Sequence, residues 1–245
     1  MSALDLVLLT LAVFAGVSAQ RLTGLGFALV SAPLLTLILG TMTGVTLMQV
    51  LGIVVSAVIL PSVWRDVEWR VLPWLLVPAW VGIVPGLLVV RSLPVAAMEV
   101  AIGVLVIVAL VAVILSERAR VFKGRRGAVA AGFLSGFMNA TASVGGPAMV
   151  LYKVSRRWAQ APFVATIQVF FIAMSMVTVT ARGWPDLAPT GWAVSLAAIV
   201  VGMVAGHRLA KVVPERVARN LTVGVALMGA VVIVIKGMMA LLSGS

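Results

Sequence analysis

The chain has 245 residues, of which 62% are hydrophobic and only 10% are charged, and this composition excludes an ordinary water-soluble globular protein. It contains no cysteine, which excludes disulfide bonds, thiolate catalysis and metals held by cysteine. The formal net charge of +11 is typical of membrane proteins, whose cytoplasmic loops are rich in Lys and Arg. We therefore expect the lipid bilayer, and no nucleic acid, as a partner.

The first apolar segment, residues 4–39, is interrupted near its middle by small and polar residues. An interrupted helix at membrane depth is tolerated only where protein or a water-filled cavity satisfies its backbone. We therefore expect 4–39 to form a helical hairpin that dips into the membrane and returns to the same side, with a cavity at its tip. The interruption contains Gln20, Arg21, Thr23, Gly24 and Gly26.

Three apolar stretches follow the first hairpin. We expect spanning helices at 44–63, 71–90 and 95–115, because about 20 apolar residues cross a bilayer. The basic stretch at 117–126 then predicts a cytoplasmic linker.

A second interrupted segment, residues 127–152, follows the linker, and we expect it to form a second hairpin. Its interruption contains Asn139, Thr141, Ser143, Gly145 and Gly146. Further apolar stretches predict three more spanning helices, at 162–181, 191–207 and 217–241.

The two halves of the chain resemble each other when one is shifted by about 120 residues. This order of matches predicts two repeats, residues 1–116 and 127–245, joined by the linker 117–126. The matched pairs are Gly16 with Gly136, Gly26 with Gly146, Gly82 with Gly202, Gly86 with Gly206, Pro94 with Pro214 and, one residue out of step, Gln49 with Gln168.

Loop charges predict the orientation of these repeats. With a hairpin and three crossings in each half the repeats are inverted, and of the 18 Lys and Arg residues all but Arg21, Arg91, Arg182 and Lys236 fall on one side. The positive-inside rule makes that side cytoplasmic and places both termini in the periplasm of a bacterial inner membrane. If each first segment crossed once instead, the basic residues would divide almost equally.

Polar residues at the two breaks are the candidates for binding a substrate. Arg21 has no carboxylate near it in the sequence, because the acids fall at segment ends or in loops, so we expect an anion as its partner; the alternative is an arginine that snorkels to a surface or bonds backbone carbonyls. Gln49 and Gln168 either bind the ligand or lock helices together. The candidate substrate-binding residues are Arg21, Gln20, Thr23, Gly24, Gly26, Gln49, Asn139, Thr141, Ser143, Gly145, Gly146 and Gln168.

The same residues argue against an enzyme. The chain has a single histidine, His207, and its acids fall at segment ends or in loops, so we expect no catalytic residues, no metal site and no cofactor. A proton relay built on a buried carboxylate is also not expected.

The two glycine-containing first segments, Gly16 through Pro33 and Gly132 through Tyr152, and the helix spacing behind them resemble the sulfite exporter TauE/SafE family, also called the TSUP transporters. The breaks depart from the family's richer glycine runs, with only Gly24-Leu25-Gly26 in the first and Gly145-Gly146 before Pro147 in the second.

The resemblance implies an inner-membrane carrier, in the exporting direction, for small sulfur-containing anions such as sulfite, sulfoacetate or other organosulfonates, working by alternating access. The alternatives are a carrier of another small carboxylate or zwitterionic solute and a membrane scaffold subunit that transports nothing. A homodimer is compatible with the sequence.

Overall fold

The computed structural model describes residues 2–23, 26–115, 122–209 and 212–243, except for the side chains of 21–23, 113, 115, 215, 216 and 219. Over these residues the chain is all-helical and contains no strand, as its composition predicted. The helices are α1 (Ala3–Thr23), α2 (Gly26–Leu39), α3 (Thr41–Val63), the short 3-10 helix η1 (Trp64–Asp66), α4 (Leu72–Ser92), α5 (Val95–Leu115), α6 (Gly124–Ala142), α7 (Gly146–Arg156), α8 (Gln160–Arg182), α9 (Pro189–Leu209) and α10 (Glu215–Ser243).

Among the described residues, seven helices are long and apolar enough to cross a membrane: α1, α3, α4, α5, α8, α9 and α10. This confirms the predicted class, an all-α integral membrane protein. The count differs from the six spanning helices expected, because α1 has an apolar stretch, Ala3–Gln20, of full spanning length. Its partner α2 has 14 residues and α7 has 11, fewer than the roughly 20 that a bilayer requires.

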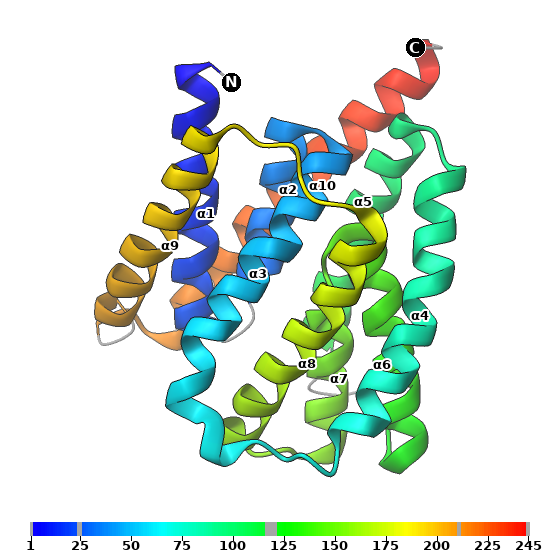
Figure 1. Cartoon of the computed structure of the whole chain (residues 1–245), viewed down its shortest axis with the longest axis vertical. Coiled ribbons are helices and arrows are strands. Elements are labelled where there is room, and N and C mark those ends of the chain that lie inside the picture. Colours follow the sequence, from blue (N-terminus) through cyan, green and yellow to red (C-terminus); the bar gives the residue numbers. More distant parts are fainter. Residues whose placement is uncertain (1, 24–25, 116–121, 210–211, 244–245) are drawn as a thin grey trace.

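Both interrupted segments fold back on themselves. In Figure 1, α1 descends from the end that carries the N-terminus and α2 returns toward it, whereas α6 rises from the opposite end and α7 returns there. The first pair packs closely, since the Ser31 hydroxyl donates a hydrogen bond to the Ala12 carbonyl at 3.0 Å. Both termini lie at the same end of the molecule (Figure 1). The division into inverted repeats stays a prediction.

Helix α6 begins three residues before the range expected for the second hairpin, so residues 124–126 of the expected linker are helical. Gly124 has φ = 59°, a backbone conformation that glycine adopts at little cost, and the chain turns into the helix there. The Arg125 guanidinium then lies 4.9 Å from the centre of the Trp74 ring on α4. This cation–π contact extends the α4–α6 interface into the first turn of α6.

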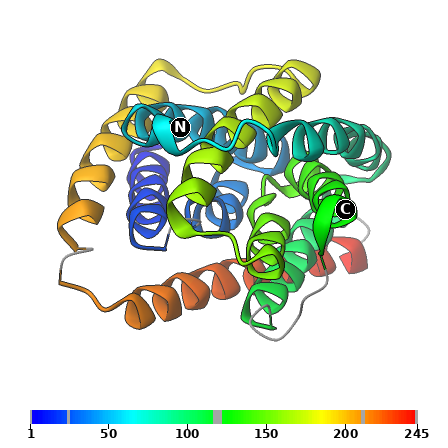
Figure 2. The ribbon, with the colours of Figure 1, turned by 90° about the horizontal axis from the view of Figure 1, so that it is seen from below.

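The helices pack in reciprocal pairs. Helix α1 packs on α9 as α6 packs on α4, α2 contacts α10 as α7 contacts α5, and α3 lies against α8 and α5 against α10. Seen from below (Figure 2), α9 and α10 run along two adjoining sides of the molecule, and α1 and α2 lie inside the corner that they form.

Four glycines bring α4 and α6 into backbone contact. Gly82 and Gly86 on α4, and Gly132 and Gly136 on α6, are each spaced by four residues, the small-residue spacing that lets membrane helices approach closely. A Cβ at Gly136 would overlap the Ala79 carbonyl oxygen, and one at Gly82 would overlap that of Phe133.

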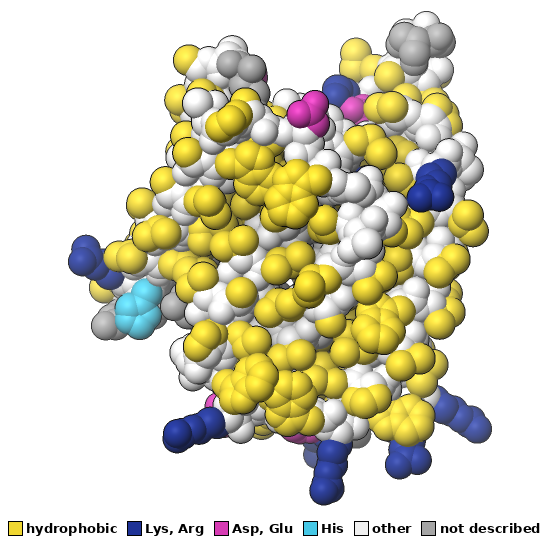
Figure 3. All heavy atoms as spheres, viewed as in Figure 1, with side chains coloured by type: hydrophobic (Ala, Val, Ile, Leu, Met, Phe, Trp, Pro, Cys, Tyr) yellow, Lys and Arg dark blue, Asp and Glu magenta, His cyan; other side chains and the backbone are white. Residues whose placement is uncertain are grey.

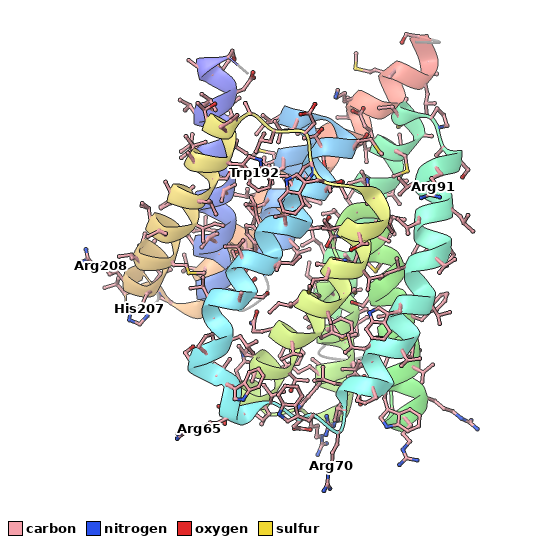
Figure 4. All side chains as sticks on the ribbon, in the orientation of Figure 1. Arg65, Arg70, Arg91, Trp192, His207 and Arg208 are labelled. Carbon is pink, nitrogen blue, oxygen red and sulfur yellow. The ribbon has the colours of Figure 1, made fainter. Side chains whose placement is uncertain are left out.

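The outer surface is apolar around its middle and basic at one end. Hydrophobic side chains cover most of the face in Figure 3, while Lys and Arg gather mainly at its lower end. Arg65 and Arg70 project from this end, and Arg91 lies near the other (Figure 4). His207, the single histidine, is exposed and projects outward from α9 beside Arg208.

A polar cluster joins two connections at the lower end. The Glu68 carboxylate accepts hydrogen bonds from Arg156 Nη2 and from Trp158 Nε1, both at 2.7 Å, and its backbone N–H donates to Thr166 Oγ1 at 3.0 Å. The α3–α4 connection is thereby fixed to the turn between α7 and α8.

Candidate substrate cavity between the helix breaks

A cavity of about 60 Å³ lies where α1, α2, α3, α6, α7 and α8 meet. It exceeds the roughly 10–15 Å³ that one water molecule requires by this measure, so it has room for a small solute. Six of the expected site residues line it: Gln20, Gln49, Asn139, Ser143, Gly145 and Gly146.

Three buried side chains form a hydrogen-bonded group beside the cavity. Gln49 Nε2 donates to the Asn139 carbonyl at 2.7 Å, and Asn139 Nδ2 donates to Gln49 Oε1 at 3.0 Å. The Ser175 hydroxyl donates to the same Gln49 oxygen at 2.6 Å. All three side chains are buried, with exposed fractions of 2% for Gln49, 4% for Asn139 and 5% for Ser175. These hydrogen bonds stabilise the fold, because a buried amide without partners costs free energy.

The second break places a helix N-terminus at the cavity. Helix α6 ends at Ala142, and the next residue, Ser143, has left-handed φ = 58° and donates its hydroxyl hydrogen to the Val45 carbonyl at 2.8 Å. The Gly145 carbonyl accepts a bond from the Ser135 hydroxyl at 2.7 Å, and α7 starts at Gly146. The first N–H groups of a helix have no intrahelical acceptor and carry the positive end of its dipole, so this end of the cavity favours an anion.

The first break supplies a second N-terminus. Gln20, near the end of α1, accepts the N–H of Phe27 on its Oε1 at 3.1 Å, so the side chain caps the start of α2. Phe27 and Ala28 both line the cavity. Two helix N-termini therefore face the same cavity, and no acidic residue is among the described residues that line it. Such a site is electrostatically suited to a small anion.

Three of the remaining candidates are described by the structure and do not line the cavity. The Thr141 hydroxyl bonds the Phe137 carbonyl of its own helix at 2.9 Å, and Gly26 packs against Ala19. Gln168 is buried but is not among the lining residues. The Arg21 and Thr23 side chains and Gly24 lie outside the described residues.

The comparisons with known proteins identify the family of the chain. A family model described as Sulfite exporter TauE/SafE matches residues 8–233. The chain belongs to the TauE/SafE family. No curated protein and no solved structure matches it. Family membership confirms the resemblance stated above, and it makes the chain a membrane transporter of sulfur anions such as sulfite rather than an enzyme.

The lining residues of this TauE/SafE protein that were absent from the sequence-based candidates include two serines, Ser56 and Ser175, and two phenylalanines, Phe27 and Phe171. The two serines carried a usable signal, because each follows a glutamine by seven residues, Ser56 after Gln49 and Ser175 after Gln168. Seven residues are two helical turns, so each pair shares one helix face. The two phenylalanines had no comparable signal in so apolar a chain.

Arg182 was counted as a basic residue of a periplasmic loop, but its side chain turns inward. Its Nη1 donates to the Ala140 carbonyl, in the last turn of α6, at 2.6 Å. A helix that ends inside a membrane protein leaves carbonyls without backbone partners, and a cation is favoured at the negative end of its dipole. Arg182 therefore stabilises the second break.

One acidic residue, Glu99, is buried, although no buried carboxylate was expected. Glu99 lies in the second turn of α5, is only 4% exposed, and accepts a bond from Lys236 of α10 at 2.7 Å. The sequence showed its place near a helix end but not that α10 covers it. A buried carboxylate therefore exists in this protein, and it is already paired with a cation.

Proposed function

We propose that this TauE/SafE protein carries sulfite, sulfoacetate or related organosulfonates out across the bacterial inner membrane by alternating access, with the anion held in the cavity between the two breaks. The observation that carries the proposal is the meeting of two helix N-termini at one cavity whose described lining contains no acid. Backbone N–H groups and helix dipoles at such a site stabilise negative charge. Gln20, Asn139 and Ser143 supply neutral hydrogen-bonding groups around it.

Anion binding is tested by thermal unfolding of the purified protein. Sulfite and organosulfonates are expected to raise the melting temperature, because a ligand that binds only the folded state at 100 times its Kd adds about 2.7 kcal/mol of stability. Neutral solutes of similar size should leave it unchanged. Stabilisation by neutral solutes alone would contradict the anion site, and stronger stabilisation by carboxylates would assign another substrate class.

Arg21 belongs to this proposal through the sequence of the first break. Its planar guanidinium suits the oxygens of a sulfonate. Arg21→Lys keeps the charge, whereas Arg21→Gln loses both the charge and the planar guanidinium. The lysine variant should therefore weaken the ligand-induced rise in melting temperature less than the glutamine variant. An unchanged shift in Arg21→Gln would remove the arginine from the site.

We also propose the orientation, with the basic end cytoplasmic and both termini periplasmic. Placement of Arg65 and Arg70 at one end supports it, because Lys and Arg are retained on the cytoplasmic side. The reciprocal packing of α1 on α9 and α6 on α4 supports two inverted repeats.

Reporter fusions test this orientation. A fusion in the linker near Lys123 should be active in the cytoplasm, and a fusion in the loop after Asp186 should be active in the periplasm. The reverse pattern would invert the molecule, and activity of both fusions on one side would exclude the proposed topology.

A further inference from the structure

Helices α3 and α8 occupy equivalent positions in the two halves of the chain. Both have 23 residues, and the same offset of 119 separates Thr41 from Gln160 and Val63 from Arg182. Helices α1 and α6 end at Thr23 and Ala142, at the same offset. At this offset Gln168 is the counterpart of Gln49, Ser56 is the counterpart of Ser175, and Gln20 is the counterpart of Asn139.

These counterparts define two triads of the same chemistry, and all of their members except Gln168 line the cavity. The Gln49 triad consists of Gln49, Asn139 and Ser175, and the Gln168 triad of Gln168, Gln20 and Ser56. In the structure the Gln49 triad is assembled, because three hydrogen bonds of 2.6 to 3.0 Å join its members.

The Gln168 triad is not assembled. Gln168 Oε1 is buried and has no hydrogen-bond partner, and no hydrogen bond of the Ser56 hydroxyl occurs within the described part of the chain, although Ser56 is only 5% exposed. Gln20 Oε1 is occupied by the Phe27 N–H. Buried polar groups without partners are rare and call for an explanation.

We infer that Gln168, Gln20 and Ser56 are positioning residues that assemble into a second triad when the Gln49 triad opens. The inference rests on the proposed alternating access. A carrier requires two states of similar free energy, and exchanging one set of amide and hydroxyl bonds for an equivalent set keeps the number of hydrogen bonds constant. The unpaired Gln168 oxygen is then the mark of the state described here, in which the second triad is open.

The exchange also accounts for the capping of the hairpins. Gln20 caps α2 through Phe27 while the Gln168 triad is open. In the other state Gln20 joins Gln168, and Asn139, released by Gln49, takes the equivalent place before the start of α7. Each hairpin tip therefore changes its hydrogen-bonding partner in every cycle.

Thiol labelling of a cavity residue tests the exchange, because the chain has no native cysteine. Ala28 lines the cavity and is partly exposed, so Ala28→Cys gives a reporter with little added volume. Membrane-impermeant maleimide is applied to oriented vesicles from either face, without any anion. The ratio of the two labelling rates reports the population of the two states.

Two matched variants should shift this ratio in opposite directions. Ser175→Ala removes a bond from the Gln49 triad and favours the state not seen here, whereas Ser56→Ala removes a bond from the Gln168 triad and favours the state described. Loss of one hydrogen bond predicts a shift of about two- to tenfold in each direction.

Gln49→Leu and Gln168→Leu should shift the labelling ratio in the same two opposite directions, by larger factors. The variant that carries both leucines should return the ratio toward that of the parent.

A shift in the same direction for both serine variants, or none in any inserted and folded variant, would overturn the two triads. Because the labelling uses no substrate, it is independent of the anion assays. If the labelling ratio shifts in opposite directions but no anion stabilises the protein, the exchange between triads is supported and the proposed substrate is refuted.

Discussion

Gly136→Val is expected to prevent stable folding. A Cβ at this position would overlap the Ala79 carbonyl oxygen of α4, and backbone cannot move aside as a flexible side chain can. One turn earlier Gly132 meets the Leu75 carbonyl in the same way, so α6 has no room to slide along α4. Overpacking costs about 1–3 kcal/mol where neighbours can adjust, and we expect more here because membrane helices associate largely through such close packing.

Gly224→Val is the matched control for this prediction. Gly224 is an exposed helical glycine of α10, with no heavy atom within 4 Å of an added Cβ. Because valine is at least as good a helix former as glycine, this variant should elute as a single species and melt near the parent temperature. Size-exclusion profiles and melting curves of the two purified variants provide the measurement. Equal stability of the two variants would mean that the α4–α6 contact is looser than described.

The sequence predicted the helices and the breaks better than the contacts between helices. Long apolar stretches mark helices directly, and polar residues such as Gln20 and Asn139 stand out within them. Gly82 and Gly136 were recognised only as markers of the repeat, because nothing in a single sequence tells which helix faces which. Their meeting at the α4–α6 interface is a tertiary result.

The candidate site shows the same division. Polar residues of both breaks reach the cavity because a break in a membrane helix must satisfy its own backbone. Gln49 and Gln168 could not be told apart from the sequence, yet Gln49 Oε1 is hydrogen-bonded and Gln168 Oε1 is unpaired. Ser56 and Ser175 were readable in principle from their spacing. Glu99 and Arg182 were not, because their partners come from distant helices.

Arg182→Met is expected to reduce transport about tenfold or more. The N–H groups of Ser143 and Val144 bond the carbonyls of Asn139 and Met138 at the end of α6, whereas the Ala140 carbonyl receives its bond from Arg182 at 2.6 Å. Methionine has similar length but no donor, so this carbonyl is left unpaired inside the protein. Such a loss costs about 1–3 kcal/mol, and 1.4 kcal/mol corresponds to a factor of ten.

Arg91→Met is the matched control for Arg182→Met, since Arg91 also donates to a backbone carbonyl, that of Ala181, but from an exposed position and at 3.4 Å. It loses the same charge without touching the break, so its transport should stay near that of the parent. Arg182→Lys, which keeps a donor and the charge favoured at a helix C-terminus, should fall between the two. The measurement is sulfite flux into proteoliposomes at equal protein density. Equal flux for Arg182→Met and Arg91→Met would show that α6 holds its break without the arginine.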